Sequence, residues 1–415
     1  MTPAAADGPP RVIVIGLLSG TSVDAIDVAA AEFAFGADGV LTVRPLGDAT
    51  HPWPARLRER ILAALPPAVL PIGEVCALDT EIGQVFGEVA ASAARTLAGG
   101  RADLVASLGQ TVFHDVRDGV CHGTLQLGQP AWIAEATGLP VVSDLRATDV
   151  AAGGHGAPLA GTLDALWLAG DNRATRPLAA GALDEPGDGA RVALNLGGIA
   201  NVTVVRPGRP LLAFDTGPAN CLLDVAAARV TSGARTCDLD GELALAGTAR
   251  ADLLAVLLDE PYFALPPPRS CGRELFSAAY LDRALAAVAP VSGPDLLATL
   301  TEFTALTVAG ALAPYRPTEV VLSGGGARNP ALVDALRRAL PGPLYATSAA
   351  HGLPEDAKEA LLVALLGALT WHHLPGTVPS ATGARRPTVL GRITPARGTP
   401  PTAPAPTSLR IVRGR

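Results

Sequence analysis

Residues 16–27, GLLSGTSVDAID, combine glycines, hydroxyls and carboxylates in a way that suits phosphate binding. They lie between two apolar runs, 11–15 and 28–33, which predict a pair of strands. In such a hairpin, backbone N–H groups and hydroxyls can surround a phosphate, and Asp24 or Asp27 can hold Mg²⁺. Turns favour the same residue types, so an ordinary β-turn is the alternative interpretation.

This segment is not a Walker A loop. That pattern needs a lysine to reach the outer phosphates, and the only lysine of the chain, Lys358, lies far from any glycine-rich loop. Nor does the segment contain the GxGxxG pattern of dinucleotide-binding folds. A phosphate bound here must be held by backbone, hydroxyls and a metal ion.

Asp215 is the candidate general base. It follows a short apolar strand predicted at 211–214 and precedes a glycine turn and a helix predicted over 219–229. A carboxylate at the carboxyl end of a strand in an α/β sheet is well placed to accept a proton. A helix-cap or turn aspartate explains the same position.

A polar loop over residues 143–159 is the candidate substrate-binding segment. It places Asp144, Arg146, Asp149 and His155 directly after a predicted strand. Arginine can bind a carboxylate with two hydrogen bonds, and aspartate can accept from sugar hydroxyls. A surface loop of ion pairs is the alternative. His155 has no HExxH partner, so we expect a hydrogen-bonding or structural role and not a metal ligand.

Two later glycine segments extend the pattern. Residues 192–205 repeat the plan of strand, glycine turn and strand, which predicts that the fold was built twice, with two phosphate hairpins facing each other across a cleft. Residues 319–340 run from a strand through three glycines into a helix starting near Pro330, a backbone that can lie flat against adenosine. A tight strand-to-helix turn is the alternative for the second segment.

The elements that position these residues alternate between strands and helices, which predicts α/β layers. The predicted elements between the first hairpin and the polar loop are a helix capped by Asp79 or Thr80 and ended by Gly99 and Gly100, a strand over 104–107, a helix from Pro130 to Gly138, and a strand over 139–142. Residues 171–189 have the composition of a linker.

The composition limits the classes of partner that this chain is expected to bind. The chain has 415 residues and a net charge of −7 without a basic cluster, so we expect small molecules and no nucleic acid. Apolar windows such as 360–371 are shorter than the roughly 20 residues that cross a bilayer, and the N-terminus lacks signal-peptide features, so we expect a soluble cytoplasmic protein without a membrane partner. The five scattered cysteines predict free thiols.

Eight segments, in order, resemble the anhydro-N-acetylmuramic acid kinase family, within the superfamily of sugar kinases, actin and heat-shock ATPases. They are GLLSGTSVDAID, SLGQTVFHD, GTLQLGQPAWIAEATGLPVVSDLRATDVAAGGHGAPL, LNLGGIANVTVV, FDTGPANCLLD, RSCGRELF, LSGGGARNPAL and GLPEDAKEALLVALL, followed by VPSATGARRPTVLGRI.

The resemblance implies an α/β fold of two actin-like (ribonuclease H-like) domains, with ATP and a sugar in the cleft between them. We expect one domain over 11–150 and a second over 151–394, whose last segment can pack back on the first. Residues 395–415, rich in Pro, Thr and Ala, are expected to form a disordered tail. The resemblance also favours a homodimer.

The family opens the 1,6-anhydro bridge of anhydro-N-acetylmuramic acid and phosphorylates the 6-oxygen with ATP, which the resemblance extends to this chain with Asp215 as base and Mg²⁺ as cofactor. Asp24 is the expected metal ligand. The expected ATP-binding residues are Gly20, Thr21, Ser22, Val23, Asp24, Ala25, Ile26, Asp27, Asn195, Gly197, Gly198, Gly324, Gly325, Gly326 and Asn329. The expected substrate-binding residues are Gln110, Asp144, Arg146, Asp149, His155, Gly156 and Asn220.

Four departures from the family pattern bear on these expectations. Leu108 replaces a histidine near the sugar side, and His155 replaces a glutamine. Ala25 and Ala219 replace glycines, which predicts small backbone shifts because alanine tolerates positive φ poorly. Two alternatives therefore stay open: a kinase for a different anhydro- or amino-sugar, and a catalytically weak sensor of nucleotide and sugar.

Overall fold

The first predicted hairpin forms, and it opens a mixed sheet. The computed structural model describes residues 10–117, 120–169, 189–267, 269–272, 275–354 and 357–396. They divide into two compact units. Unit 1 contains the described residues up to Phe113, Leu125–Asp144 and those from Gly391 on, and unit 2 contains those of His114–Thr124 and Leu145–Leu390.

The sheet of unit 1 has the strand order β12-β6-β4-β1-β2-β3, with β5 paired to β4. Strands β1, β2 and β3 are antiparallel neighbours, whereas β4 is parallel to β1 and to β6. The strands are β1 (Arg11–Ser19), β2 (Ile26–Phe35), β3 (Leu41–His51), β4 (Leu104–Arg117), β5 (Val120–Leu127), β6 (Val141–Ser143) and β12 (Arg392–Thr394).

Helices α1 (Ala55–Ala64), α2 (Ile72–Thr96) and α3 (Pro130–Thr137) pack on the sheet of unit 1. Pro130 begins α3 and Gly138 ends it with φ 71°, as predicted. The predicted N-terminal cap of α2 at Asp79 or Thr80 is wrong, because the helix begins earlier, at Ile72. Asp79 instead accepts from Gly128 N (2.8 Å), ahead of α3. The apolar spacing of a helix does not show how many residues of the helix come before its first buried side chain.

The sheet of unit 2 has the order β11-β10-β7-β8-β9. Strands β7, β8 and β9 are antiparallel neighbours, and β10 is parallel to β7 and to β11. This is the plan of β3-β2-β1-β4-β6 in unit 1, so the prediction of a twice-built fold is confirmed. The strands are β7 (Ala190–Leu196), β8 (Ile199–Val205), β9 (Leu212–Pro218), β10 (Pro317–Ser323) and β11 (Leu344–Thr347).

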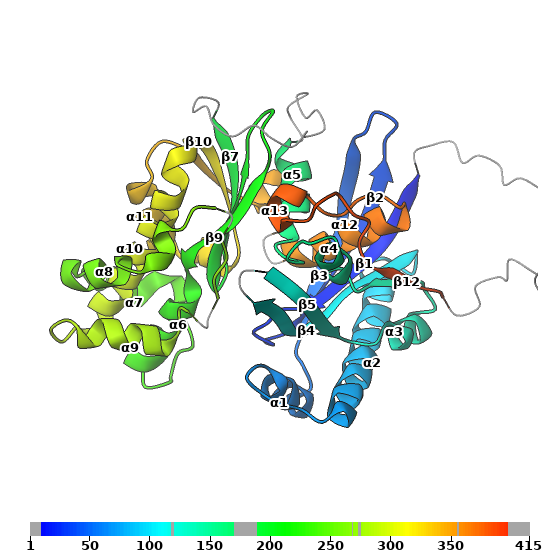
Figure 1. The fold of residues 1–415 in the computed structure, drawn as a ribbon, viewed down its shortest axis with the longest axis horizontal. Coiled ribbons are helices and arrows are strands. Elements are labelled where there is room, and N and C mark those ends of the chain that lie inside the picture. The colour runs from blue at the N-terminus through cyan, green and yellow to red at the C-terminus, as the bar shows by residue number, and fades with distance from the viewer. Residues whose placement is uncertain are drawn as a thin grey trace, which may run out of the picture. The chain divides into compact units, whose positions relative to one another are not determined.

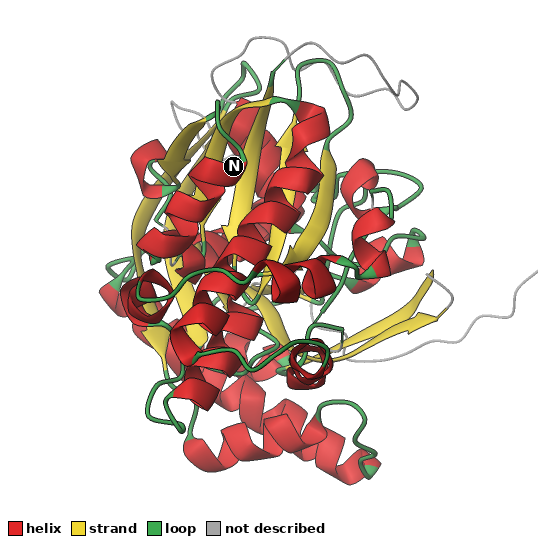
Figure 2. Ribbon diagram, turned by 90° about the vertical axis from the view of Figure 1, so that its left-hand side faces the viewer, coloured by secondary structure: helices red, strands yellow, loops and turns green. Residues whose placement is uncertain are grey.

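Helices cover both faces of the unit 2 sheet. Side chains of α10 and α11 pack on one face, with Val308 and Leu332 against Val192 and Leu322, and Figure 2 views the unit from this side. Helix α5 packs on the other face through Leu168 (Figure 1). The helices of unit 2 are α4 (Ala147–Ala151), α5 (Ala160–Ala169), α6 (Asn220–Val230), α7 (Glu242–Leu245), α8 (Ala251–Leu258), α9 (Ala278–Ala286), α10 (Gly293–Leu312), α11 (Pro330–Ala339), α12 (Lys358–Trp371) and α13 (Pro379–Thr382), with short 3₁₀ turns.

One stretch in the described part of the chain, Gly293–Tyr315, has the length and apolar composition of a membrane span. With 23 residues it is longer than the apolar window 360–371, so the expectation that the apolar windows are too short to cross a bilayer is wrong for this stretch. Most of it is buried within the protein, which is the environment of a core helix. Residues 171–188 of the predicted linker and 397–415 of the predicted tail lie outside the described residues.

Candidate active site

The hairpin between β1 and β2 forms a loop with exposed polar groups and two buried apolar side chains. Gly20 O accepts from Val23 N (3.1 Å), and Val23 has φ 55° and a fully buried side chain. Ile26 is buried as well, whereas Thr21 and Asp24 are exposed. Of the predicted ATP-binding residues in this loop, Val23 and Ile26 therefore anchor it, and the exposed groups are those that can meet a ligand.

Three side chains of unit 1 hold this hairpin. Arg58 Nε donates to Val23 O (2.8 Å), and its Nη2 lies 3.7 Å from Asp24 Oδ1. Trp53 Nε1 donates to Ser19 Oγ (3.1 Å). Gln110 Nε2 donates to Gly20 O (3.2 Å), and the buried Gln110 Oε1 has no partner among the described residues. The structure thus places Gln110 against the hairpin, where it supports the loop.

The hairpin between β7 and β8 turns through Gly197 and Gly198 and is fixed to the start of α6. Gly198 O accepts from Ala219 N and Cys221 N (both 3.0 Å). Asn220 donates from its backbone N to Gly197 O (3.0 Å) and from Nδ2 to Leu196 O (2.9 Å). Asn220, which the sequence assigned to the substrate, therefore has its amide group on this hairpin.

Two of the three glycines after β10, Gly324 and Gly326, pack directly on the same hairpin. Gly324 has φ 80°, and a Cβ there would lie 2.5 Å from Asn195 Oδ1. A Cβ on Gly326 would lie 2.8 Å from Leu196 Cβ. Asn329 caps α11 by accepting from Leu332 N (3.2 Å). The predicted glycine turn and helix start are confirmed, and only glycine fits this approach of two backbones.

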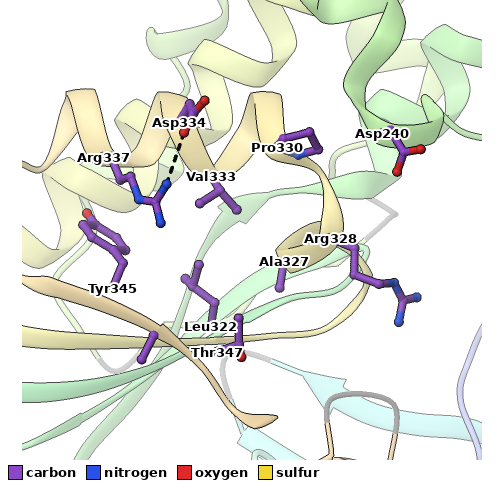
Figure 3. Close-up of a pocket in the computed structure, with 11 residues that line it drawn as sticks. Asp240, Leu322, Ala327, Arg328, Pro330, Val333, Asp334, Arg337, Tyr345 and Thr347 are labelled. Atoms are coloured by element: carbon purple, nitrogen blue, oxygen red, sulfur yellow. Dashed lines mark hydrogen bonds and ion pairs between the residues drawn. The ribbon is translucent and has the colours of Figure 1, made fainter. Parts of the chain in front are cut away.

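A cavity of about 390 Å³ lies beside this glycine loop (Figure 3). Helix α11 forms one wall and strands β10 and β11 form another. The Tyr345 hydroxyl donates to Leu340 O (2.8 Å), which leaves the ring as the surface offered to the cavity. The lining residues are Asp240, Leu322, Ala327, Arg328, Pro330, Val333, Asp334, Arg337, Tyr345, Ala346 and Thr347.

Polar residues form a row across four strands of the unit 2 sheet. Ser323 of β10 is paired with Asn195 of β7, Asn195 with Asn201 of β8, and Asn201 with Asp215 of β9. Residues paired directly across strands project from the same face of a sheet. The row therefore runs from the glycine loop to the candidate base, and sequence reasoning missed Asn201 and Ser323 as its members.

Asp215 lies within β9 and not at its carboxyl end as predicted, because the strand continues to Pro218. Its carboxylate Oδ2 accepts from Cys271 N (2.9 Å), and its backbone O accepts from Tyr262 Oη (2.8 Å). Burial, Cys271 and the Asp215 charge raise the pKa of Tyr262 far above its usual range, so this phenol stays a hydrogen-bond donor.

The polar loop of unit 2 is organised around Asp149, which is fully buried. Its Oδ2 accepts from Gly156 N and its Oδ1 from Thr382 Oγ1, both at 2.7 Å. Arg146 Nη1 donates to Gly156 O (2.6 Å), and His155 N donates to Thr382 O (2.8 Å). Asp149 has the geometry of a loop-organising residue, and no sequence pattern points to its partner Thr382, which lies 233 residues away.

Positive and neutral nitrogen groups surround this loop. Burial lowers the pKa of Arg146, which the charge of Glu359 opposes. Burial, Arg146 and His155 lower the pKa of His114, so the imidazole is held neutral. A neutral imidazole and a guanidinium beside a glycine-rich loop are suited to binding sugar hydroxyls and a carboxylate.

The predicted substrate residues fall into both units. Arg146, Asp149, His155 and Gly156 are brought together in unit 2, whereas Gln110 and Asp144 belong to unit 1. Asp144 has φ 59° and its Oδ2 lies 4.0 Å from Arg392 Nε.

Neither of the two alanines that replace family glycines adopts a positive φ. Ala219 has φ −121°, and Ala25 is not among the residues with positive φ. In the first hairpin Val23, with φ 55°, takes the left-handed position, so Ala25 needs none.

Two sheets of one plan, each opening with a glycine-containing hairpin, define the class of actin-like ATPases and sugar kinases on duplicated ribonuclease H-like domains. Within that class, residues 12–396 match the family described as anhydro-N-acetylmuramic acid kinase, and the chain belongs to this family.

Curated relatives of that name align over nearly the whole chain. The protein of Streptomyces coelicolor is 53% identical over 97% of this chain and 99% of its own length. The protein of Rhodococcus erythropolis is 48% identical over 96% of this chain and 98% of its own.

Solved structures are similar at low sequence identity. A ROK family glucokinase from Streptomyces griseus in complex with glucose and AMPPNP is 14% identical over 86% of this chain and 99% of that chain, with a TM-score of 0.32. The activator of the 2-hydroxyisocaproyl-CoA dehydratase from Clostridium difficile with bound ADPNP is 15% identical over 86% and 94%, with a TM-score of 0.38.

Proposed function

We propose that this chain is an ATP-dependent kinase that hydrolytically opens 1,6-anhydro-N-acetylmuramic acid and phosphorylates its 6-oxygen. The products are N-acetylmuramic acid 6-phosphate and ADP, and the reaction serves cell-wall recycling. Family membership over residues 12–396 is the observation that carries the proposal. Asp215, held at the end of a polar row that starts at the glycine loop, supports it.

Asp215 is the general base in this proposal. Its carboxylate accepts a proton from the water that attacks the anomeric carbon, the bond from that carbon to the 6-oxygen breaks, and the 6-oxygen takes the γ-phosphoryl group of ATP. Arg146 and His155 bind the sugar, and Asp149 keeps their loop in shape through Gly156 and Thr382.

In unit 2, the cavity beside Gly324–Gly326 takes the adenosine of ATP in this proposal. In unit 1, the hydroxyls of Thr21 and Ser22 and the backbone of the first hairpin are suited to phosphate oxygens. In unit 2, the glycine turn at Gly197 and Gly198 is suited to them as well. Tyr345 supplies an aromatic wall to the cavity, which suits a planar base.

Mg²⁺ accompanies the nucleotide in this proposal. Among the described residues there is no cluster of three or more His, Cys, Asp or Glu side chains that could hold a metal. Asp24, 71% exposed in its side chain, fits an ion held by one carboxylate, nucleotide phosphates and water. When bound, the ion neutralises charge that develops on the phosphates.

A coupled ADP-release assay tests the proposal with the anhydro-sugar as substrate. We expect turnover by the wild-type protein and a loss of roughly 10²–10⁴-fold in kcat for Asp215→Asn, the range for removing a general base. Asp282→Asn is the matched control, since Asp282 is exposed and pairs with Arg229 at the surface. No wild-type turnover, or full activity of Asp215→Asn, contradicts the proposal; a panel of other anhydro- and amino-sugars tests whether Leu108 redirects the specificity.

A further inference from the structure

Asp215 lies on an edge strand, so one side of it has no strand partner. β9 pairs with β8 and ends the sheet order. An edge strand leaves backbone N–H and C=O groups without sheet hydrogen bonds, which protein structures cover in other ways. At Asp215 the cover comes from the described residues of the segment 261–271.

This segment binds both backbone groups of Asp215 and its side chain. Asp215 N donates to Arg269 O (3.0 Å), and Asp215 O accepts from Tyr262 Oη (2.8 Å) and Arg269 Nε (3.3 Å). Two residues further along, Cys271 N donates to Asp215 Oδ2 (2.9 Å). The direction of the carboxylate is thus tied to the path of this segment.

Arg269 fixes the path of the segment. Its Nη1 donates to Leu265 O (2.7 Å), Phe263 O (2.8 Å) and Tyr262 O (3.3 Å). Its guanidinium carbon lies 5.1 Å from the centre of the Tyr262 ring and 5.8 Å from that of Phe214. One side chain therefore joins the segment, the neighbour of Asp215 in the strand, and Asp215 itself.

Aromatic side chains pack together around Phe263 of the segment and hold it in place. Phe263 stacks on Phe276 at 5.8 Å and contacts Phe303 edge-on at 5.7 Å. A Cβ on Gly217, two residues after Asp215, would lie 2.9 Å from Phe263. The backbone of β9 and this ring are therefore in close contact next to the candidate base.

We propose that Arg269 is a positioning residue that holds the Asp215 carboxylate in its working direction through the segment 261–271. The proposal rests on Asp215 being the base of the proposed reaction. Lysine cannot replace arginine here, because an ammonium group lacks the planar fork that reaches several carbonyls and Asp215 O at once.

Steady-state kinetics of Arg269→Lys and Arg269→Ala test the proposal. We expect kcat to fall roughly 10- to 100-fold, the scale for a catalytic group displaced by about an ångström, with the KM for sugar and for ATP changed by less than about threefold. Added guanidinium, but not methylammonium, is expected to restore part of the kcat of Arg269→Ala. The acid limb of kcat/KM moves to higher pH if the carboxylate loses the Cys271 N–H bond that stabilises its charged form.

Arg283→Lys is the matched control, because Arg283 also lies over a tyrosine ring, that of Tyr280 at 5.8 Å, away from Asp215. A raised KM for ATP with unchanged kcat overturns the proposal in favour of a phosphate contact. Unchanged kcat per folded enzyme, with only a lower unfolding temperature, overturns it in favour of a purely structural role.

The proposal can fail separately from the proposed function. Wild-type turnover with the sugar tests the function alone. Crystal structures of the wild type and Arg269→Ala test positioning without turnover: we expect the separation of Cys271 N and Asp215 Oδ2 to exceed 3.5 Å in the variant, and an intact hydrogen bond in the variant overturns the proposal.

Discussion

The third strand of each sheet is an edge strand, but the two units treat it differently. In unit 1, β3 alternates between exposed and partly buried residues, and its Thr50 donates to Asp27 Oδ1 (2.8 Å). In unit 2, β9 is mostly buried and the segment 261–271 covers it at Asp215. Helices α6 to α10 lie between the third and fourth strands of unit 2, whereas unit 1 has α1 and α2 there. The longer connection of unit 2 contains the segment 261–271.

The two hairpins differ in the same way as the two edge strands, with the more exposed one in unit 1. The first is a longer loop with hydroxyls and the exposed Asp24, held by side chains such as Arg58. The second is a two-glycine turn whose carbonyls are taken by the start of α6. One sheet plan thus serves two purposes: a polar, open loop in unit 1 and a closely packed backbone beside the candidate base in unit 2.

Breaking the buried ion pair of unit 2 is expected to have the largest effect on stability. Lys358 Nζ lies 2.8 Å from Asp164 Oδ1, and both side chains are less than 10% exposed. Lys358→Met leaves a buried carboxylate unpaired and is expected to cost about 3–5 kcal/mol. In unit 1, Arg60 is more exposed and pairs with Glu74 and Glu81. Arg60→Met is expected to lower the free energy of unfolding by about 1 kcal/mol or less.

Urea unfolding of both variants measures this difference. The double variant Lys358→Met/Asp164→Leu is the control, and it is expected to recover most of the loss because it removes both charges. Equal losses for Lys358→Met and Arg60→Met would show that burial does not distinguish the two sites.

Glycines in the two hairpin regions are expected to differ in how well they tolerate alanine. Gly324→Ala is expected to cost about 3 kcal/mol and raise the KM for ATP, because φ is 80° and the new Cβ meets Asn195 Oδ1 and Leu196 O. Gly20→Ala is the control for stability, because the nearest atom to its Cβ is Ser22 Oγ at 3.9 Å. Gly20 lies in the proposed phosphate loop, so the KM for ATP of Gly324→Ala is compared with that of the wild type. Thermal unfolding and ATP kinetics check both, and a tolerated Gly324→Ala would contradict the close approach.

Two threonines that donate to carboxylates give a smaller contrast. Thr382→Val removes the donor to the fully buried Asp149 and is expected to cost about 2 kcal/mol, with a higher KM for the sugar. Thr50→Val removes an exposed bond to Asp27 and is expected to cost under about 0.5 kcal/mol. Similar costs would mean that Asp149 does not organise its loop.

The smallest effect expected is a difference in acid sensitivity. The folded pKa of His114 in unit 2 lies below the ordinary 6.5, so its contribution is present above pH 6.5 and is lost as pH falls below it, because the unfolded chain then binds a proton that the folded state does not. The Arg44 hydrogen bond lowers the pKa of Glu32 in unit 1, so that contribution is lost only below pH 4.5.

Unfolding followed between pH 7 and 5 checks this order. His114→Gln is expected to flatten the profile in this range, and Glu32→Gln is expected to leave its slope unchanged. A profile that Glu32→Gln flattens and His114→Gln does not would reverse the assignment.

Local sequence was sufficient for the hairpins, the helix from Pro130 to Gly138 and the glycine turn before α11. These features depend on neighbours within a few residues, through strand alternation, the fixed φ of proline and the freedom of glycine. The start of α2 was not predictable, because Asp79 has the residue type of a cap and yet serves a loop 49 residues away.

The sequence by itself determined the duplicated α/β plan, the glycine loops and Asp215 as the candidate base, since each is written in a short pattern. Tertiary structure decided what holds them: the Asp149 bond to Thr382 joins residues 233 apart, and the Arg269 bond to Asp215 spans 54. Such bonds depend on the path of the chain between the partners, and no local pattern specifies that path.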